Sequence, residues 1–527
     1  MLRHYLKQPK SKYLFIFLFS IIFAVIFLLP IFSPGPILTL DNVATPVLAK
    51  NVWGLFSLNS VLLQKLFLFT AIGVAVAGIC INLLELEIIS WLTAIVFLTG
   101  SPFFLERLAI GQWHILLAVG LLLWSIYFFR KVNAESQRQK ILYTLLALFF
   151  AWLSFDIYHR AISFLEIVTF SGMIVWIYNG KKGAFALARF LLCLSLVITA
   201  ILTVDLLARN FSHILIKMAR GEGALFFPLG EGEIWQKFVG IFGYIGFWAE
   251  KAQRVPVNFQ SAWHWYLLGI AWFILAIPGA IFVWKKNNNL FLFLLIQYIL
   301  SFIVVLSGAS NIPEQKLFKM YDLFGLIGLR ETGKFMGLMA ISQSIMLGYT
   351  VNLISKKINT TKTKYQMMAI LLSFCVIANF ALIGFHTYIS ISPNQIPPSI
   401  LEYAQKANQE NKKVIIFPWH RYQSYSFTQG KVIDQLGLSL FNLYVFNEAV
   451  EYNGVITNSP EDWQQQIATA TETELNADLL HKMLKEREVN KILIFKTNDF
   501  QRYIDWAENE NFTKEIENSE FASYNFQ

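Results

Sequence analysis

Apolar residues dominate the chain in repeated windows of about 18–22 residues, each long enough to cross a hydrocarbon core of ~30 Å. The windows recur from Tyr13 to about His386 and then stop. They predict about eleven transmembrane helices, which start near Tyr13, Val61, Ile88, Trp113, Ile141, Ala161, Ala184, Trp265, Leu290, Phe335 and Tyr365. The first window has no small-residue cleavage site behind it, so we expect a retained helix rather than a cleaved signal peptide.

Beyond His386 the pattern becomes that of a soluble protein. A proline-punctuated linker, ISPNQIPPSI (391–400), comes first. The strand and helix patterns that follow it are VIIFPWH (414–420), DLLHKMLKERE (478–488), KILIFK (491–496) and DFQRYIDWAENE (499–510). We therefore expect a transmembrane domain over residues 1–386 and a small α/β domain over residues 387–527.

Composition agrees with a membrane protein. Of the 527 residues, 56% are hydrophobic and 15% are charged, whereas an ordinary soluble protein has roughly 25% charged residues. The three cysteines, Cys80, Cys193 and Cys375, lie in or at the ends of apolar windows, with no suggested pairing. We expect neither a disulfide framework nor a zinc site.

Cationic residues cluster between alternate apolar windows, which places them on one side of the membrane. The clusters are Arg3/Lys7/Lys10/Lys12, Arg130/Lys131/Arg138/Lys140, Lys181/Lys182, Lys285/Lys286 and Lys356/Lys357/Lys362/Lys364. Such clusters are typical of cytoplasmic loops, so we expect a cytoplasmic N-terminus. With an odd number of helices, the C-terminal domain is then extracytoplasmic. These clusters explain most of the net charge of +9, and no nucleic-acid partner is needed to account for it.

Acids and bases that hydropathy does not explain fall mostly on the predicted external side. The first external loop holds Asp41, the second Glu106 and Arg107, the third Asp156 and His159, and the fifth Asp322, Arg330, Glu331 and Lys334. Together they offer a base, oxygen ligands for a cation and partners for a phosphate. The alternative is that each is solvated or paired with lipid headgroups, as polar residues at helix ends commonly are. His114 and His159 are weak metal ligands by themselves.

Two aromatic stretches have more than one interpretation. EIWQKFVGIFGYIGFWAEKAQ (233–253) is weakly amphipathic and predicts a segment in the membrane interface rather than a sugar-stacking surface. PWHRYQSYSF (418–427) follows a predicted strand, where α/β folds place binding loops. Its Trp419, His420 and Tyr422 suit a sugar or a lid contact. The alternative is that Trp419 and Tyr425 pack the domain against the membrane part.

Three short motifs resemble the GT-C superfamily of polytopic glycosyltransferases that use polyprenyl-phosphate-linked sugars. They are P-G-P…L-D-N…P in the first external loop, P-F-F-L-E-R-L…G-Q-W in the second, and G-L-R-E-T-G-K-F near residue 330. The closest similarity is to poorly characterised prokaryotic members, whose second external loop ends in G-[QH]-W and whose penultimate transmembrane helix begins with R-E-P-x-K-F. Thr332 stands where proline is usual, and Glu106 is followed by Arg107, so the acid–x–acid pair of better-known relatives is absent.

The resemblance implies roles for particular residues. Asp41 corresponds to the catalytic acid of the first loop and Glu106 to the acid of the second. Arg107, Arg330 and Lys334 are candidates to bind the donor phosphate, while Gln112 and Trp113 would mark the headgroup level. The further candidate contacts are Asp156, His159 and Glu331. The need for a metal stays open: if the reaction uses a divalent cation, Mg²⁺ or Mn²⁺, Glu106 and Asp156 are its candidate ligands.

The sequence thus predicts an all-α polytopic membrane protein of GT-C type with a small extracytoplasmic α/β domain. Its expected function is transfer of a sugar from a polyprenyl-phosphate donor to a glycan, lipid or protein acceptor in the cell envelope, with inversion and with Asp41 as base. Two alternatives remain. A transporter or flippase of lipid-linked sugars would favour internal repeats and charges at mid-membrane, neither of which is evident. The other alternative is a non-catalytic scaffold for envelope glycan assembly.

Overall fold

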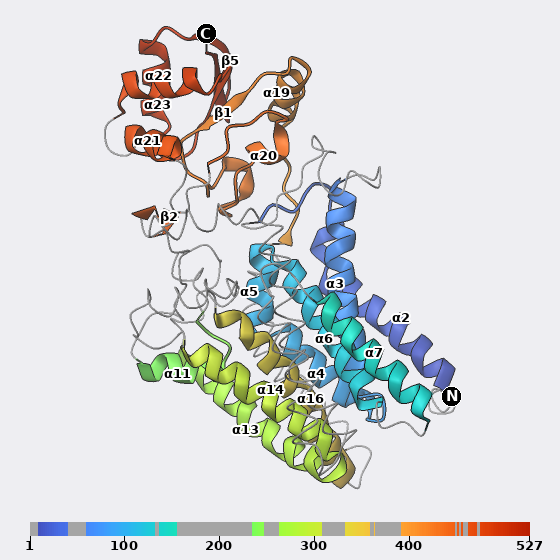
Figure 1. Ribbon diagram of the computed structural model, residues 1–527. Helices are drawn as coiled ribbons and strands as arrows, with labels where there is room; N and C mark the ends of the chain where they lie inside the picture. Colours follow the sequence, from blue (N-terminus) through green and yellow to red (C-terminus); the bar gives the residue numbers. More distant parts are fainter. Residues whose placement is uncertain are drawn as a thin grey trace.

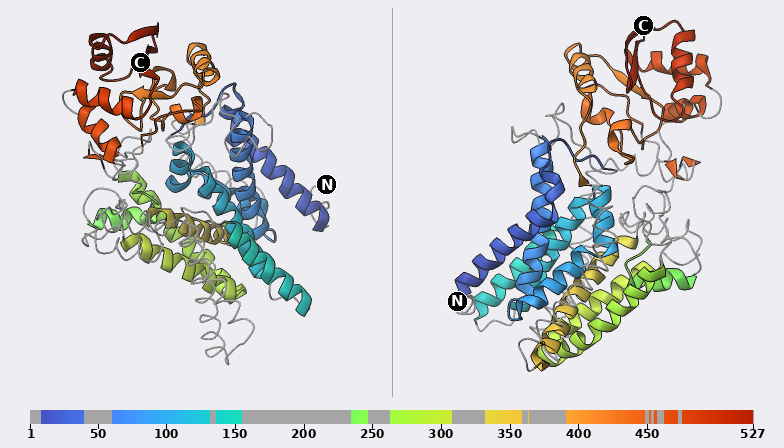
Figure 2. Two further views of the ribbon diagram at one scale, coloured as in Figure 1. Left: turned by 45° about the horizontal axis from the view of Figure 1, so that its top comes forward. Right: turned by 180° about the vertical axis from the view of Figure 1, so that it is seen from behind.

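The computed structural model describes residues 9–39, 60–131, 136–154, 234–246, 263–307, 332–358, 363, 391–447, 451–452, 455–456, 462–471 and 475–526. Within these ranges the chain forms a helical bundle with a smaller, sheet-containing domain at one end (Figures 1 and 2). The bundle consists of α2 (Pro9–Phe27), α3 (Ser60–Asn82), α4 (Ile88–Thr99), α5 (Pro102–Ile110), α6 (Trp113–Lys131), α7 (Gln137–Leu153), α11 (Ile234–Phe242), α13 (Trp263–Lys286), α14 (Asn288–Ser307), α16 (Met336–Lys357) and the short 3-10 helices η1 (Leu29–Phe32) and η5 (Thr332–Phe335).

Eight of the predicted helix starts lie within four residues of a helix start in the structure. The helices predicted at Ile88 and Trp113 begin at those residues. The three predicted near Ala161, Ala184 and Tyr365 lie outside the described residues. In the described part of the chain, four helices are long and apolar enough to cross a membrane, or five if α4 and α5 form one bent span. The predicted number of eleven is therefore not confirmed.

The apolar helix that starts at Ile88 is broken by its sequence. α4 ends at Thr99, Gly100 follows as its C-cap, and Ser101 begins α5 as an N-cap whose side chain accepts a hydrogen bond from the Phe104 amide. Pro102 has no amide hydrogen to continue the α4 hydrogen-bond ladder, but it is well suited to the first position of a new helix. The chain bends by 54° at this break, so the segment after Ser101 turns across the end of the bundle.

α16 is the central helix, since nearly all of its side chains are buried and it packs on α4, α13 and α14. Its contact with α13 accommodates Pro278, which interrupts the α13 hydrogen-bond ladder. The Thr350 hydroxyl donates to the Leu275 carbonyl and accepts from the Gly279 amide, both at 2.8 Å. Because Leu275 and Gly279 would normally bond to each other, Thr350 satisfies both groups from the neighbouring helix.

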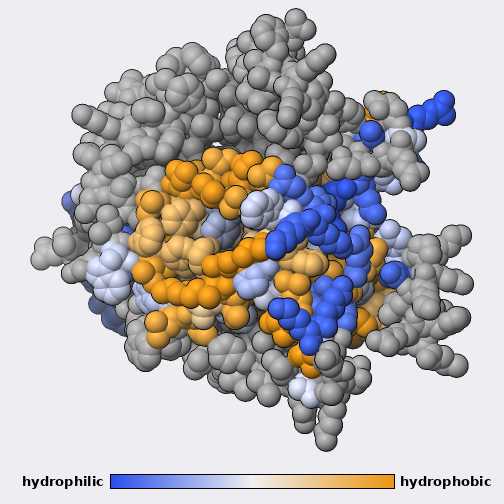
Figure 3. Space-filling model, turned by 90° about the horizontal axis from the view of Figure 1, so that it is seen from below, coloured by the Kyte–Doolittle hydropathy of each residue, from blue (hydrophilic) through white to orange (hydrophobic). Residues whose placement is uncertain are grey.

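One end of the bundle carries the cationic clusters that the structure describes, at the C-termini of α6, α13 and α16. The turn between α3 and α4 connects these helices, because Glu85 Oε2 lies 2.9 Å from Lys286 Nζ and Glu87 accepts a hydrogen bond from Ser355. The hydrogen bond from Lys286 lowers the pKa of Glu85. From below, hydrophilic side chains gather over part of this end (Figure 3). The C-terminal domain lies at the opposite end (Figures 1 and 2).

The C-terminal domain is built on a four-stranded sheet of order β1-β4-β6-β5. Its elements are α19 (Pro398–Gln409), β1 (Val414–Phe417), η7 (Ser426–Thr428), α20 (Gly437–Leu440), β2 (Glu451–Tyr452), β3 (Val455–Ile456), α21 (Asp462–Thr471), α22 (Ala477–Glu486), β4 (Lys491–Phe495), α23 (Gln501–Asn509), β5 (Thr513–Glu517) and β6 (Phe521–Asn525). β1 and β4 are parallel, and the other pairs in this sheet are antiparallel. β2 and β3 form a separate pair.

β1 and β4 are buried along their whole length, which explains the apolar runs VIIF in β1 and ILIF in β4. Ile415 and Ile492 lie in one core with α21, α22 and α23, while Val414 and Leu493 lie in the other with α19 and α20. The predictions of β1, β4, α22 and α23 are confirmed. The predicted linker is shorter than expected, because α19 already begins at Pro398. The β5–β6 hairpin was not predicted.

Candidate active site

Glu106 and Arg107 lie on α5, at the end of the bundle that faces the C-terminal domain (Figure 1). The helix begins at the Ser101 cap and ends at Gly111, whose φ of 90° is the left-handed conformation that stops a helix. The two side chains are 3% and 1% exposed. The structure thus places them on a buried helix rather than in a loop between two helices, and their position on the external side stays a prediction. The apolar residues around them on α5 pack into the bundle core, so both charged side chains are buried with them.

The guanidinium of Arg107 is oriented from two sides. Its Nη1 donates a 2.6 Å hydrogen bond to Oε1 of Gln112, and its Cζ lies 5.6 Å from the centre of the Phe103 ring. Phe103 precedes Arg107 by four residues, so both side chains share one face of α5. A charged donor strengthens the hydrogen bond, and the face of an aromatic ring attracts a cation.

Gln112 and Trp113 form the tight connection between α5 and α6. The Gln112 amide donates to the Arg107 carbonyl at 2.9 Å, and the Trp113 indole donates to the Leu108 carbonyl at 3.0 Å. Gln112 is 8% exposed and Trp113 is fully buried. Both side chains bind residues of α5, and their place at the lipid headgroup level stays a prediction. His114 follows them on α6 and is partly buried.

Phe103 also connects α5 to the start of α16. A Cβ added to Gly337 would lie 2.7 Å from the Phe103 ring, so the ring occupies the space of a side chain on α16. Lys334 lies three residues before Gly337, in η5, and is 4% exposed. Sequence reasoning missed Phe103 and Gly337, although their spacings of four and three residues from Arg107 and Lys334 are helical neighbour spacings.

The G-L-R-E-T-G-K-F segment leads into α16 through a 3-10 turn. The α-helix begins only at Met336, and Lys334 lies in the preceding 3-10 turn. Arg330 and Glu331 lie outside the described residues, as do the other predicted site residues Asp41, Asp156 and His159. Of the ten predicted site residues, the structure thus places Glu106, Arg107, Gln112, Trp113 and Lys334, around α5 and the start of α16.

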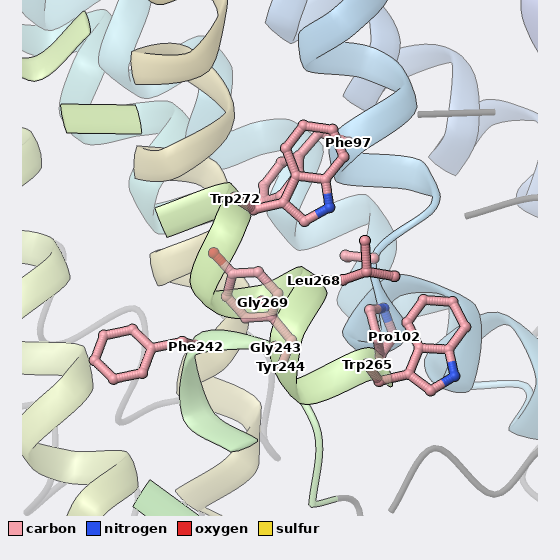
Figure 4. A pocket seen from close by; sticks show the side chains of 10 residues that line it. Phe97, Pro102, Phe242, Gly243, Tyr244, Trp265, Leu268, Gly269 and Trp272 are labelled. Carbon is pink, nitrogen blue, oxygen red and sulfur yellow. The ribbon is translucent and has the colours of Figure 1, made fainter. Parts of the chain in front are cut away.

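A pocket opens beside the first turn of α5 (Figure 4). The space it encloses is small, about 20 Å³. Its lining residues are Phe97, Ser101, Pro102, Phe242, Gly243, Tyr244, Trp265, Leu268, Gly269 and Trp272. Aromatic rings dominate the lining, and the buried Tyr244 hydroxyl donates to Gln343 of α16. Such a lining offers a mainly apolar surface.

The 233–253 stretch contributes to this pocket through its helical part, α11. Trp235 and Phe238 of α11 are exposed, whereas Ile241 is buried in the bundle core. Phe242 and Tyr244, at and after the end of the helix, line the pocket. The described part is helical over Ile234–Phe242, and its place in the membrane interface stays a prediction.

The loop after β1 is only partly available for binding. Trp419 and Tyr425 are buried in the two cores of the C-terminal domain itself, so they do not pack the domain against the membrane part. His420 is partly exposed, and its Nε2 lies 3.8 Å from Oδ2 of Asp499, in the loop after β4. The loops after β1 and β4 meet there because these strands are parallel.

The described residues do not by themselves form a metal site. Among them, no group of three or more histidine, cysteine, aspartate or glutamate side chains is placed to hold an ion. Glu106 is followed directly by a buried arginine on the same helix, which disfavours a cation at its carboxylate. Asp156, the other predicted ligand, lies outside the described residues.

Comparison with known proteins shows a shared fold. No protein-family model matches the sequence, and no curated protein matches it. The structure is similar to that of the arabinofuranosyltransferase AftD from mycobacteria, with a TM-score of 0.55 and 12% identity, over 96% of this chain and 40% of that chain. A mutant AftD gives a TM-score of 0.54, 14% identity and coverages of 96% and 41%.

A further similar structure is the archaeal oligosaccharyltransferase AglB from Archaeoglobus fulgidus, in complex with an inhibitory peptide and a dolichol-phosphate. Its TM-score is 0.44 at 12% identity, over 96% of this chain and 73% of that chain. The present chain spans about two fifths of the length of AftD. The predicted resemblance to GT-C glycosyltransferases is confirmed at the level of the fold.

Proposed function

We propose that this chain, with its GT-C fold, is a membrane glycosyltransferase that moves a sugar from a polyprenyl-phosphate-linked donor to an extracytoplasmic acceptor. The observation that carries the proposal is the group of buried charges Glu106, Arg107 and Lys334 at one end of an apolar bundle. Charges in such a position are costly, and in membrane proteins they mark functional sites. The neighbouring aromatic pocket offers an apolar surface for the first isoprene units of a lipid donor.

The proposed reaction is an inverting displacement. A base takes the proton of an acceptor hydroxyl as its oxygen attacks the anomeric carbon; the bond from that carbon to the phosphate oxygen breaks, and polyprenyl phosphate leaves with the electron pair. We assign the base to Asp41 from the family resemblance. Arg107 and Lys334, with Arg330, would balance the charge of the departing phosphate. The proposal assigns no step to a metal ion.

The proposed sidedness follows from where the charges lie. The basic clusters of α6, α13 and α16 occupy the end of the bundle opposite to the C-terminal domain, and such clusters are typical of the cytoplasmic side. A reporter fused after Gln527 should therefore be extracytoplasmic, and one inserted at Asn133 cytoplasmic. Protease accessibility from outside measures this. A cytoplasmic C-terminal domain would contradict the proposed site as well.

The central experiment is to incubate the purified protein with a panel of labelled polyprenyl-phosphate sugars and to follow loss of the lipid-linked label. Asp41→Asn, which keeps the size of the side chain but is a much weaker base, should lower transfer by at least ~10²-fold. Asp322→Ala is the matched control, because it removes another predicted external acid and should have much less effect. No consumption of any donor, or equal mild effects of both variants, would contradict the proposal.

A further inference from the structure

Residues 33–39, which we call the junction segment, run between the bundle and the C-terminal domain (Figures 1 and 2). They follow η1 at the end of the first helix. In the sequence, they directly precede the loop that holds Asp41.

On the bundle side, the junction segment is bound by the first turns of α3. Gln64 accepts a 3.0 Å hydrogen bond from the Ile37 amide and donates a 2.7 Å bond to the Ile37 carbonyl, as a neighbouring strand would. Lys65 donates to the Ser33 carbonyl at 2.6 Å. Gln64 is buried, so breaking its two hydrogen bonds would leave polar atoms unsatisfied.

On the domain side, the junction segment is bound by the linker that leads into α19. The Asn394 amide donates to the Pro36 carbonyl at 2.8 Å. Gly35 has a φ of +104°, and a Cβ added to it would lie 2.4 Å from the Asn394 carbonyl oxygen. Glycine is required here on both counts, for the backbone conformation and for the close approach.

Two consecutive residues of the segment enter two different cores. Ile37 is fully buried in the core of the bundle, and Leu38 is fully buried in the core of the C-terminal domain with Ile396 and Tyr403. Successive side chains of an extended chain point in opposite directions, which permits this arrangement.

The same linker is joined to the loop after β1. The Asn394 side chain donates to the Phe427 carbonyl at 3.1 Å and accepts from Lys431 Nζ at 3.1 Å. Lys431 also donates to the Ser392 carbonyl at 2.6 Å. A continuous set of hydrogen bonds therefore runs from the C-terminal domain through Asn394 to the junction segment and on to α3.

We propose that the junction segment staples the C-terminal domain to the bundle and thereby positions Asp41, with Gly35, Leu38, Gln64 and Asn394 as positioning residues. Asp41 follows the last described residue of the segment, Thr39, by two positions, so restraining the segment limits where the carboxylate can lie. The domain is then part of the catalytic unit rather than a tethered module. The catalytic part of this inference rests on the proposed glycosyl transfer.

The test compares Gly35→Ala with Gly430→Ala in the full-length protein. Both glycines have positive φ, but a Cβ at Gly430 meets nothing within 4 Å, so the pair separates backbone strain from the clash with Asn394. Hydrogen exchange of peptides covering residues 33–39 and 391–397 should accelerate by at least about tenfold in Gly35→Ala only. With a polyprenyl-phosphate sugar that the wild type consumes, kcat should fall about tenfold or more while the donor KM stays within about threefold.

A second pair of variants, at Leu38, tests the same contact in case Gly35→Ala does not fold. Leu38→Met keeps the buried apolar volume and should preserve both exchange and kcat, whereas Leu38→Asp should change both. Unchanged exchange in Gly35→Ala and Leu38→Asp would overturn the staple. Faster exchange with an unchanged kcat would overturn the positioning role alone. A wild-type protein that consumes no donor would refute the glycosyltransferase proposal, and with it the positioning role, while the exchange data would still decide whether the staple exists.

Discussion

The hydrogen bond between Arg107 and Gln112 offers a sharp test of the candidate site. It is 2.6 Å long, has a charged donor, and joins two side chains that are 1% and 8% exposed. Gln112→Leu removes the acceptor but keeps a side chain of similar size. Hydrogen bonds to charged groups contribute about 1.5–3 kcal/mol net. If all of this energy orients the guanidinium in the transition state, donor turnover should fall roughly 10- to 150-fold.

The matched control is Gln112→Glu, which keeps an acceptor oxygen at the same reach and should retain turnover within about tenfold. Both variants are assayed for loss of label from a polyprenyl-phosphate sugar, well below their thermal midpoints, so that loss of folded protein does not count as loss of activity. If Gln112→Leu kept its turnover within twofold of wild type, Arg107 would not act through this contact. An equal loss in both variants would show that Gln112 matters for a reason other than its acceptor oxygen.

Three further predictions follow. Gly337→Ala should destabilise the protein by about 1–3 kcal/mol, because its Cβ meets the Phe103 ring, and its thermal midpoint should fall. Gly73→Ala is the control, since its Cβ meets nothing within 4 Å; equal midpoints of the two variants would contradict the prediction. Arg330→Lys should weaken donor binding or turnover by roughly tenfold if Arg330 binds phosphate through its planar fork, whereas values within twofold would leave Arg107 as the remaining candidate. Burial lowers the pKa of Lys431 to about 8, so between pH 8 and about 10.4 its proton is held more tightly by the unfolded chain. As the pH increases across that window, the thermal midpoint of the wild type should therefore rise relative to that of Lys431→Met. A difference between the two midpoints that does not change with pH would contradict the lowered pKa of Lys431.

The helices that the sequence predicted well are those whose signal is local. A long apolar window needs only its own residues to be recognised, which explains the agreement at α4 and α6. In the same way, β1 and β4 were found because both of their faces are buried and their sequences are continuously apolar. The β5–β6 hairpin lacks such a signal. β5 is an exposed edge strand with the sequence TKEIE, whose charged side chains are typical of protected edges and of loops alike.

The placement of Glu106 and Arg107 could not be predicted, because it depends on distant parts of the chain. Glycine, serine, proline and two charges in succession are typical of a loop between two transmembrane helices. Here Pro102 begins a new helix instead, and α16 provides Gly337, against which Phe103 packs. No local pattern around residue 106 reveals a partner more than two hundred positions away. The sequence therefore identified the charged residues and missed their burial.

That burial bears on why the charges are present at all. α5 is otherwise an apolar helix that fits into the bundle core, so apolar residues at positions 106 and 107 would form the same helix without desolvating two charged groups. Moving a charged side chain out of water costs free energy, so stability alone does not account for Glu106 and Arg107. A buried guanidinium held in one orientation by Gln112 and Phe103 is already desolvated before an anion arrives. The free energy of desolvating and orienting the guanidinium is then part of folding rather than of anion binding. This is the advantage of a preorganised site for a charged transition state.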